Sequence, residues 1–245
     1  MKIICCIPAR YESSRFPGKP LASILGRPMI YWVCKAMSQI PEVSRTYVAT
    51  DDERIFKVVN EFGGNAIMTG ECSCGSERVY EACKDLDFDI VLNIQGDEPM
   101  MRKEIVMDLI SAFNDPDVYI ATLKKQLHTE NEINNPNIAK VITDKNQNAI
   151  YFSRSTIPYN RDKTPDVVYY KHIGVYAYKK DFLAKFVQMP RSLLEVAEEL
   201  EQLRAIENGY DIRVIETQYE SIGVDLPEHI SLVEQHMKGL GEPND

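Results

Sequence analysis

The sequence predicts an α/β domain with a mostly parallel central sheet and helices on both faces. In the first hundred residues, short apolar runs alternate with segments of helical periodicity, which is the pattern of βαβ units. The apolar runs are continuous, as is typical of strands buried on both faces of a parallel sheet. With 245 residues and 44% apolar content, the chain can bury one sizeable core. We expect a single domain over residues 1–240 and a frayed tail at 241–245.

The first half of the chain reads as repeated strand and helix pairs. The predicted elements are strand 3–7, helix 30–39, strand 46–49, helix 53–62, strand 66–69, helix 77–84, strand 89–94 and helix 103–113. Asp52 and Glu53 begin the second helix, where their carboxylates suit the cap and the positive helix end. The acidic cluster there is therefore explained first as a cap and only second as a ligand contact.

The middle of the chain changes to consecutive strands joined by turns rich in Asn and Asp. We predict strands at 119–123, 139–143, 149–152 and 169–178, with a charged loop at 160–168, so that residues 125–180 form a strand-rich region. An amphipathic helix is predicted at 193–208, closed by Gly209, and is followed by a last strand at 211–216.

Composition restricts the partners. The formal charge of −9 and the pI near 5.1 argue against a nucleic-acid-binding surface, but they permit a small cationic pocket. The apolar run at 3–7 is too short for a signal peptide, and no later segment has the length of a membrane span. We expect a cytoplasmic protein with no membrane partner.

The six cysteines are expected to be reduced, because the chain is too long and too rich in core to need a disulfide scaffold. Most of them read as small core residues. Cys72-Ser73-Cys74 is the only candidate for metal or redox chemistry. Without a second cysteine pair or a histidine cluster nearby, we do not expect a zinc site.

The loop after the first strand concentrates three cations, Arg10, Arg15 and Lys19, among residues that fix the backbone. The carboxyl edge of an α/β sheet is where ligands bind, and an acidic protein that gathers cations there needs an anion between them. A polyphosphate fits this pattern, although the Walker A spacing is absent. The alternative is a turn with solvated charges.

A second polar edge follows the buried strand at 89–94, where Gln95, Asp97 and Glu98 reach the same side of the sheet. A carboxylate beside a triphosphate must be neutralised, and Mg²⁺ does so with hard oxygen ligands. Asp97 is the first candidate ligand. Gly96 between a buried strand and a Pro exit indicates a close backbone approach, and a plain turn is the alternative.

These stretches resemble motifs of the nucleotidyltransferases that make CMP-sugars, most closely the 3-deoxy-manno-octulosonate (KDO) cytidylyltransferases. The motifs are Ile7-Pro-Ala-Arg-Tyr-x-Ser-x-Arg-x-Pro-Gly-Lys-Pro-Leu21, Gln95-Gly-Asp-Glu-Pro99 and Gly223-Val-Asp-x-Pro-Glu228, and the resemblance runs from Ile3 to about Met237. It implies a single Rossmann-like nucleotidyltransferase domain that transfers CMP from CTP to the anomeric hydroxyl of KDO and releases pyrophosphate. It also implies Mg²⁺, and a homodimer whose contact lies in the mid-chain strands.

The resemblance also implies residue roles. The triphosphate and the metal would be handled by the catalytic residues Arg15, Lys19, Asp97 and Asp225, of which Asp97 and Asp225 hold Mg²⁺. The nucleotide would contact Pro8, Ala9, Arg10, Arg15, Lys19, Cys74, Gly75 and Arg78. The sugar acid would contact Gln95, Arg154, His172, Tyr176, Glu201 and Gln202. The alternatives are structural: a helix cap for Asp225, a solvated helix start for Arg78 and a satisfied strand residue for His172.

Departures from the family pattern leave rival functions open. Cys72 stands where His is usual and Cys74 where Ser is usual, and a thiol is a weak donor and acceptor. The altered loop could mark another acceptor, such as 8-amino-KDO, a nonulosonate or a phosphonate. It could also mark a non-catalytic nucleotide-binding protein or a thiol-dependent regulator. Intact Asp97 and Asp225 favour an active enzyme. With KDO as acceptor, the product would feed lipopolysaccharide or capsule synthesis.

Overall fold

The computed structural model of the chain describes residues 1–13, 16–219 and 222–239. The contacts divide the chain into two compact units. The first unit comprises residues 1–103 and 220–245, and the second comprises 104–219. The single domain expected over 1–240 stays a prediction, and the expected tail at 241–245 lies outside the described residues.

The sheet of the first unit is parallel throughout. Its strands lie in the order β6-β1-β4-β5, where β1 is Ile3–Pro8, β4 is Val43–Thr50, β5 is Asn65–Met68 and β6 is Ile90–Asn93. Cys5 and Cys6 in β1 are fully buried, so both thiols belong to the core as expected. All six cysteines are free of disulfides.

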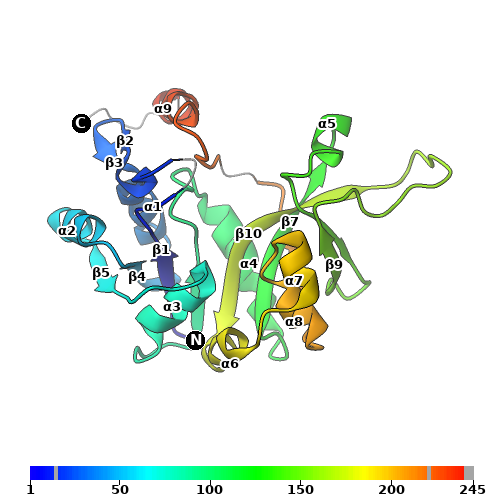
Figure 1. Cartoon of the computed structure of the whole chain (residues 1–245), viewed down its shortest axis with the longest axis horizontal. Coiled ribbons are helices and arrows are strands. Elements are labelled where there is room, and N and C mark those ends of the chain that lie inside the picture. The colour runs from blue at the N-terminus through cyan, green and yellow to red at the C-terminus, as the bar shows by residue number, and fades with distance from the viewer. Residues whose placement is uncertain (14–15, 220–221, 240–245) are drawn as a thin grey trace. The chain divides into compact units, whose positions relative to one another are not determined.

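Helices cover both faces of this sheet (Figure 1). They are α1 (Met29–Ser38), α2 (Glu53–Glu61) and α3 (Gly75–Cys83). The short η1 (Lys19–Leu21) and the hairpin of β2 (Ser23–Ile24) and β3 (Arg27–Pro28) lie between β1 and α1, and α9 (His229–Gly239) packs against this hairpin and α1. The crossovers through α1 and α2 step across the sheet in one direction, and the crossover through α3 returns. Right-handed connections therefore place α3 on the face opposite α1 and α2. Asp52 caps α2 as predicted, accepting the Arg54 N–H at 2.9 Å.

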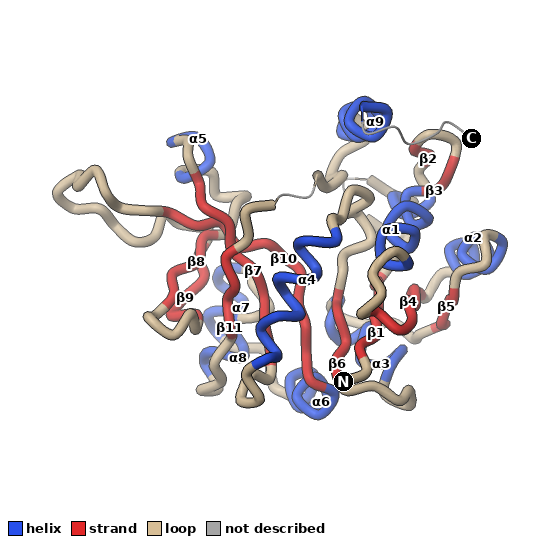
Figure 2. Tube along the Cα trace, turned by 180° about the vertical axis from the view of Figure 1, so that it is seen from behind, coloured by secondary structure: helices blue, strands red, loops and turns tan. Residues whose placement is uncertain are grey.

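The second unit is built around β7 (Ile120–Leu127), which pairs in parallel with β11 (Arg213–Glu216) and antiparallel with β10 (Tyr169–Lys179) (Figure 2). β8 (Lys140–Thr143) pairs with β10 and with β9 (Ala149–Ser153). The helices are α4 (Lys103–Ser111), η2 (Ala112–Asn114), α5 (Glu130–Ile133), α6 (Lys180–Gln188), α7 (Leu193–Glu198) and α8 (Leu203–Glu207). The predicted α/β class with mostly parallel central strands is confirmed. In the described part of the chain, no helix has the length and apolar character needed to cross a membrane.

One predicted element is wrong. The continuous helix expected at 193–208 is two short helices, α7 and α8, because Glu199 takes the left-handed conformation with φ 50° and ψ 47°. A capping box at Ser192 starts α7, and Gly209 with φ 77° follows α8 as predicted. The sequence analysis also missed the short elements α5, α6, β2 and β3.

Candidate active site

The carboxyl end of β1 meets the start of α3. Pro8 ends β1, and a Cβ atom on Gly75 would lie 3.6 Å from the Pro8 Cγ atom. Ala9 is buried and donates its N–H to the Ala49 carbonyl at 2.9 Å. Cys74 is the N-cap residue of α3. Four of the predicted nucleotide contacts therefore lie together at the sheet edge, beside backbone N–H groups that favour an anion.

Three of the four predicted catalytic residues come together next to this edge. The Lys19 Nζ atom lies 2.5 Å from Asp97 Oδ2 and 3.8 Å from Asp225 Oδ1. Gly18 places Lys19 there by its left-handed φ of 71°, with its N–H bonded to the Tyr11 carbonyl at 2.8 Å. The fourth predicted residue, Arg15, lies outside the described residues.

The backbone explains why the two carboxylates are close to one cation. A Cβ atom on Gly96 would lie 3.3 Å from the Pro8 carbonyl oxygen, which confirms the predicted close backbone approach at Gly96 and shows that β1 is the segment approached. The Val224 N–H donates to the Asp97 carbonyl at 2.9 Å. This hydrogen bond fixes the segment that carries Asp225 against the segment that carries Asp97.

The donor set suits a hard divalent cation. Asp97 and Asp225 offer carboxylate oxygens with side chains 32% and 58% exposed, so water and phosphate oxygens can reach the same place. Magnesium binds through one or two carboxylates, with substrate phosphates and water completing its shell. Within the described residues, no group of three or more His, Cys, Asp or Glu side chains forms a ready protein-only metal site. The chemistry of these two residues therefore fits magnesium carried in with a polyphosphate.

The other predicted phosphate contacts differ in their surroundings. Arg10 is exposed and, with Tyr11 and Arg54, lines an open hollow of about 760 Å³. Arg78 is buried, and its guanidinium donates to Asp51 Oδ2 at 2.6 Å and to Thr69 Oγ1 at 2.8 Å. Arg78 thereby ties α3 to the ends of β4 and β5. Its contact with phosphate stays a prediction.

The altered cysteine loop lies at the start of α3. Both Cys72 and Cys74 are half-buried, and burial raises the pKa of the Cys72 thiol despite the nearby Arg78. Cys72 is therefore protonated at neutral pH, which is unlike a reactive or metal-binding thiolate. Gln95, expected at the sugar acid, is half-buried and donates to Asn93 Oδ1 at 3.4 Å.

In the second unit, His172 and Tyr176 point the same way from β10, as the alternation predicted. Their ring centroids are 5.5 Å apart, and His172 Nε2 lies 3.0 Å from Thr122 Oγ1. Burial lowers the pKa of His172 to about 3, so the imidazole is neutral. Burial, with Tyr178 and Glu201 nearby, raises the pKa of Tyr176, which keeps its phenol protonated. Both rings can therefore serve as neutral hydrogen-bonding groups.

Gln202 is only 3% exposed, and its Nε2 atom has no hydrogen-bond partner within the described residues. Buried amides are nearly always paired, so this donor marks a place for a bound group. Glu201 is half-buried and acts electrostatically on Tyr176. Gln202, Glu201 and Tyr176 thus belong to one neighbourhood.

Arg154, expected at the sugar-acid carboxylate, is anchored to backbone. Its Nε donates to the Glu198 carbonyl at 2.7 Å, and its two terminal nitrogens lie 3.4 Å from the Pro136 and Glu199 carbonyls. The Glu198 carboxylate in turn accepts from the Arg154 N–H at 2.8 Å and from Ser153 Oγ at 2.6 Å. The predicted contact with a carboxylate stays a prediction.

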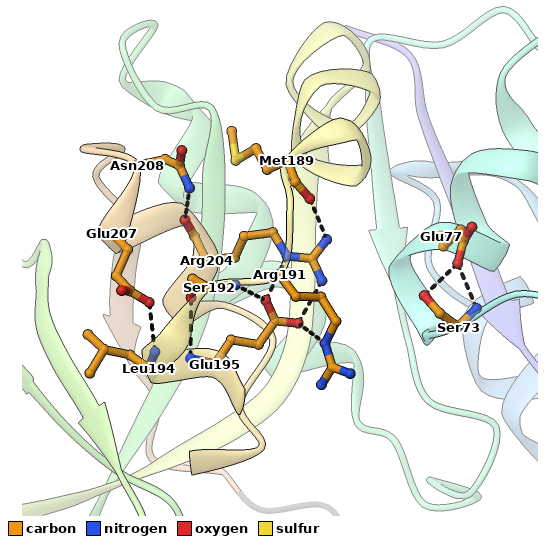
Figure 3. A network of polar contacts seen from close by, with 10 residues as sticks. All are labelled: Ser73, Glu77, Met189, Arg191, Ser192, Leu194, Glu195, Arg204, Glu207 and Asn208. Carbon is orange, nitrogen blue, oxygen red and sulfur yellow. Dashed lines mark hydrogen bonds and ion pairs between the residues drawn. The ribbon is translucent and has the colours of Figure 1, made fainter. Parts of the chain in front are cut away.

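Sequence reasoning missed two buried polar arrangements near these residues. Lys140 is fully buried and donates to three backbone carbonyls. Glu195 and Arg204 form a buried ion pair (Figure 3). Hydrophobic periodicity does not reveal either arrangement, because it assigns charged residues to exposed positions and these three side chains are buried.

Comparison with known proteins identifies the family. A family model described as Cytidylyltransferase matches residues 4–214. The 3-deoxy-manno-octulosonate cytidylyltransferase of Syntrophus aciditrophicus is 47% identical over 243 residues, with 97% of this chain and 98% of that protein covered. The protein of the same name from Fusobacterium nucleatum is 47% identical over 241 residues, with the same two coverages.

A solved structure gives the same answer. The chain matches a CMP:2-keto-3-deoxy-manno-octonic acid synthetase complexed with CTP at a TM-score of 0.93 and 42% identity, covering 98% of this chain and 100% of that one. These matches confirm the resemblance drawn from the motifs and confirm that the chain is an enzyme. The chain belongs to the cytidylyltransferase family and, within it, to the 3-deoxy-manno-octulosonate cytidylyltransferases.

Proposed function

We propose that this chain transfers CMP from CTP to the anomeric hydroxyl of KDO, giving CMP-KDO and pyrophosphate. The observation that carries the proposal is the gathering of Lys19, Asp97 and Asp225 at one sheet edge, in a chain that matches KDO cytidylyltransferases over nearly its full length. One cation and two carboxylates beside a loop of further cations suit a nucleoside triphosphate with a divalent cation.

The nucleotide would bind at the carboxyl end of β1. Pro8, Ala9, Cys74 and Gly75 provide the wall and the helix N-terminus there. Arg10 and Lys19 provide positive charge for the phosphates, and Arg15 belongs to the same predicted loop. A thiol at position 74 is a weaker hydrogen-bonding partner than a hydroxyl. Recognition of the base in this chain would therefore depend more on the fit between the base and the pocket than on a hydrogen bond from residue 74.

The reaction is a substitution at the α-phosphorus. The anomeric oxygen of the acceptor forms a bond to that phosphorus, the bond to the bridging oxygen breaks, pyrophosphate leaves, and the hydroxyl proton passes to solvent. Lys19 would offset negative charge as it builds on the phosphates, and the sheet edge would hold the reactants in line. Asp97 and Asp225 would hold Mg²⁺, which when bound supplies charge stabilisation and lowers the pKa of a coordinated hydroxyl.

The acceptor would be recognised by residues of the second unit. His172 and Tyr176 offer neutral donors, Glu201 offers a carboxylate, and Gln202 offers a buried amide donor that has no partner among the described residues. Several convergent hydrogen bonds of this kind suit a sugar with many hydroxyls. Arg154 would serve the acceptor carboxylate, for which a planar guanidinium is well matched, and Gln95 is a further proposed contact of the sugar.

Three further properties belong to this proposal. CTP is a cytoplasmic metabolite, which supports action in the cytoplasm. A homodimer would use the strand-rich region at 125–180, where β8 and β9 extend beyond the central strands. CMP-KDO made by the enzyme would supply lipopolysaccharide or capsule synthesis.

The experiment that tests the proposal is pyrophosphate release with CTP and Mg²⁺ against KDO, 8-amino-KDO, N-acetylneuraminate and a phosphonate. Turnover with KDO at the highest kcat/KM supports the proposal. Preference for another acid would reassign the acceptor. Absence of release with all four acids, from protein shown by calorimetry to bind CTP, would contradict the proposed reaction and favour a non-catalytic nucleotide binder.

A further inference from the structure

A buried ion pair spans the break between α7 and α8. Arg204 donates from Nε to Glu195 Oε2 at 2.8 Å and from Nη2 to Glu195 Oε1 at 2.6 Å, with the two side chains 6% and 5% exposed (Figure 3). Glu195 also closes the capping box with Ser192 at the start of α7. The carboxylate is therefore held from both helices.

This ion pair is incompatible with a continuous helix. Two residues nine positions apart in an α-helix are separated by about 13 Å along the axis and point to opposite sides, since 3.6 residues make a turn. The side chains of Glu195 and Arg204 can form two hydrogen bonds only if the helix breaks between them. The periodicity of 193–208 favours one amphipathic helix, so the ion pair opposes the local preference of the chain.

The break carries the residues proposed for the acceptor. It comprises Glu199, in the left-handed conformation, through Gln202, which caps α8 with its backbone. The near end of the break is tied to β9, because Arg154 Nε donates to the Glu198 carbonyl at 2.7 Å. The far end is tied through Arg204. Between these anchors lies the Gln202 side chain, which is buried and whose Nε2 donor has no partner in the part of the chain that the structure describes.

We infer that Glu195 and Arg204 are positioning residues for the acceptor: they hold the 199–202 break so that the Gln202 amide and Glu201 face a polar group of the sugar acid. This inference rests on the proposed function. If the helix continued through the break, the side chains of residues 201 and 202 would take the directions that the helical repeat imposes. The Gln202 amide would then no longer face the acceptor.

Stability alone does not account for the pair. A buried ion pair costs about as much in desolvation as it returns in attraction, and well-packed apolar residues of similar volume often serve at least equally well. What the charged pair adds is a defined geometry, because a bidentate guanidinium–carboxylate contact fixes both partners. The double variant Glu195→Leu/Arg204→Met keeps the volume and removes that geometry.

The test uses steady-state kinetics of the full chain with CTP and KDO. For Arg204→Lys and for the double variant, we expect KM for KDO to rise about tenfold, the value of one good hydrogen bond, and KM for CTP to stay within about twofold. Arg213→Lys is the matched control, since Arg213 is ion-paired to Asp115 in the same unit and neither residue belongs to the break. It should leave both constants unchanged.

Hydrogen exchange followed by mass spectrometry gives a readout that needs no acceptor. Residues 199–203 should change their exchange protection in the double variant and keep it in Arg213→Lys. A folded double variant with unchanged exchange at 199–203 would overturn the inference, and so would an unchanged KM for KDO or an equal rise in both KM values. If the unaltered enzyme does not turn over KDO, the proposed function fails, and the exchange experiment still decides whether the pair holds the break.

Discussion

The Lys19 ammonium nitrogen lies 2.5 Å from the Oδ2 atom of Asp97. The same nitrogen lies 3.8 Å from Oδ1 of Asp225. One cation thus faces two carboxylates, so these three side chains together carry one excess negative charge. This charge attracts a divalent cation. The bound cation in turn offsets the repulsion between the carboxylates and a negatively charged triphosphate, so that the triphosphate can bind at this edge.

Replacing Asp97 tests this arrangement. In Asp97→Asn, the uncharged amide cannot neutralise Lys19 and is a weaker ligand for a hard cation than a carboxylate, so we expect kcat to fall about a hundredfold or more. Pyrophosphate release with saturating CTP and KDO measures the loss. Asp87→Asn is the control, because the Asp87 side chain is 93% exposed. Activity of Asp97→Asn within about twofold of the unaltered enzyme would refute the role of this carboxylate.

Removal of divalent cations provides an independent prediction. EDTA should abolish turnover, and Mg²⁺ or Mn²⁺ should restore it, since both ions accept carboxylate and phosphate oxygens. In Asp225→Asn, one protein ligand is lost, so the Mg²⁺ concentration for half-maximal activity should rise about tenfold. A titration of activity against Mg²⁺ measures this shift. An unchanged midpoint would favour the helix-cap role for Asp225.

The parts of this site that could be predicted are those governed by strand ends. In a parallel sheet, carboxyl ends gather at one edge, so the loops after β1 and β6 had to bring Lys19 and Asp97 near each other. The chemistry of the carboxylates and cations then follows from the residue types. The close approach at Gly96 could be predicted as well. Gly96 follows a buried strand and has no side chain, so the backbone of a neighbouring segment can come close to it.

The parts that could not be predicted depend on side chains meeting across long loops. The break at Glu199 depends on the ion pair between Arg204 and Glu195. Hydrophobic periodicity reports only the spacing of apolar residues, so it does not reveal this pair. Arg78 reads in the sequence as a phosphate ligand or a solvated residue, and nothing in the sequence pattern indicates that its buried guanidinium donates to Asp51. Lys140 stands at a strand end, where nothing in the sequence indicates that its side chain is fully buried.

The close approach at Gly96 predicts that even a methyl side chain at this position is poorly tolerated. In Gly96→Ala, the added Cβ atom would lie 3.3 Å from the Pro8 carbonyl oxygen and 3.6 Å from Ile30 Cδ1, so β1 or the loop must shift. We expect a loss of about 1–3 kcal/mol in the free energy of unfolding and a lower affinity for CTP. Urea denaturation and calorimetry measure the two effects. Gly70→Ala, where nothing lies within 4 Å of the new atom, is the control.

His172 predicts a pH dependence of stability. Burial lowers its pKa to about 3 in the folded chain, against about 6.5 when unfolded. Above pH 6.5, histidine is neutral in both states and contributes no slope. As the pH falls from 6.5 towards 3, the unfolded histidine takes up a proton that the folded one does not, so the free energy of unfolding falls by up to about 1.4 kcal/mol per pH unit.

The variant His172→Asn should remove this term, so its free energy of unfolding should fall less steeply between pH 6.5 and pH 5. Urea denaturation over that range measures the slope. His128→Asn, at an exposed position, is the control variant. Identical slopes for His172→Asn and the unaltered chain would show that the imidazole titrates alike in both states. Turnover should not depend on protonation of His172 in this range, because the folded imidazole is already neutral.

Lys140 predicts a large cost of substitution at a position with no role in the proposed chemistry. Its side chain is fully buried, and Nζ donates to the carbonyls of Asn135 at 2.9 Å, Ile138 at 2.7 Å and Arg154 at 2.7 Å. The ammonium has three donors and meets three acceptors, so its hydrogen-bonding capacity is filled. These bonds join the segment after α5 to the end of β9.

In Lys140→Met, the apolar stem is kept, but three partly buried carbonyls lose their partner. We expect the free energy of unfolding to fall by about 2–4 kcal/mol, because each unsatisfied buried group carries a desolvation cost. Urea denaturation measures the change, and Lys145→Met at an exposed position should alter stability by less than about 0.5 kcal/mol. If Lys140 instead contacted substrate, Lys140→Met would keep its stability and raise KM for KDO. The three hydrogen bonds of the ammonium predict the opposite result. The free energy of unfolding should fall, and kcat and KM should change only if the Arg154 backbone shifts.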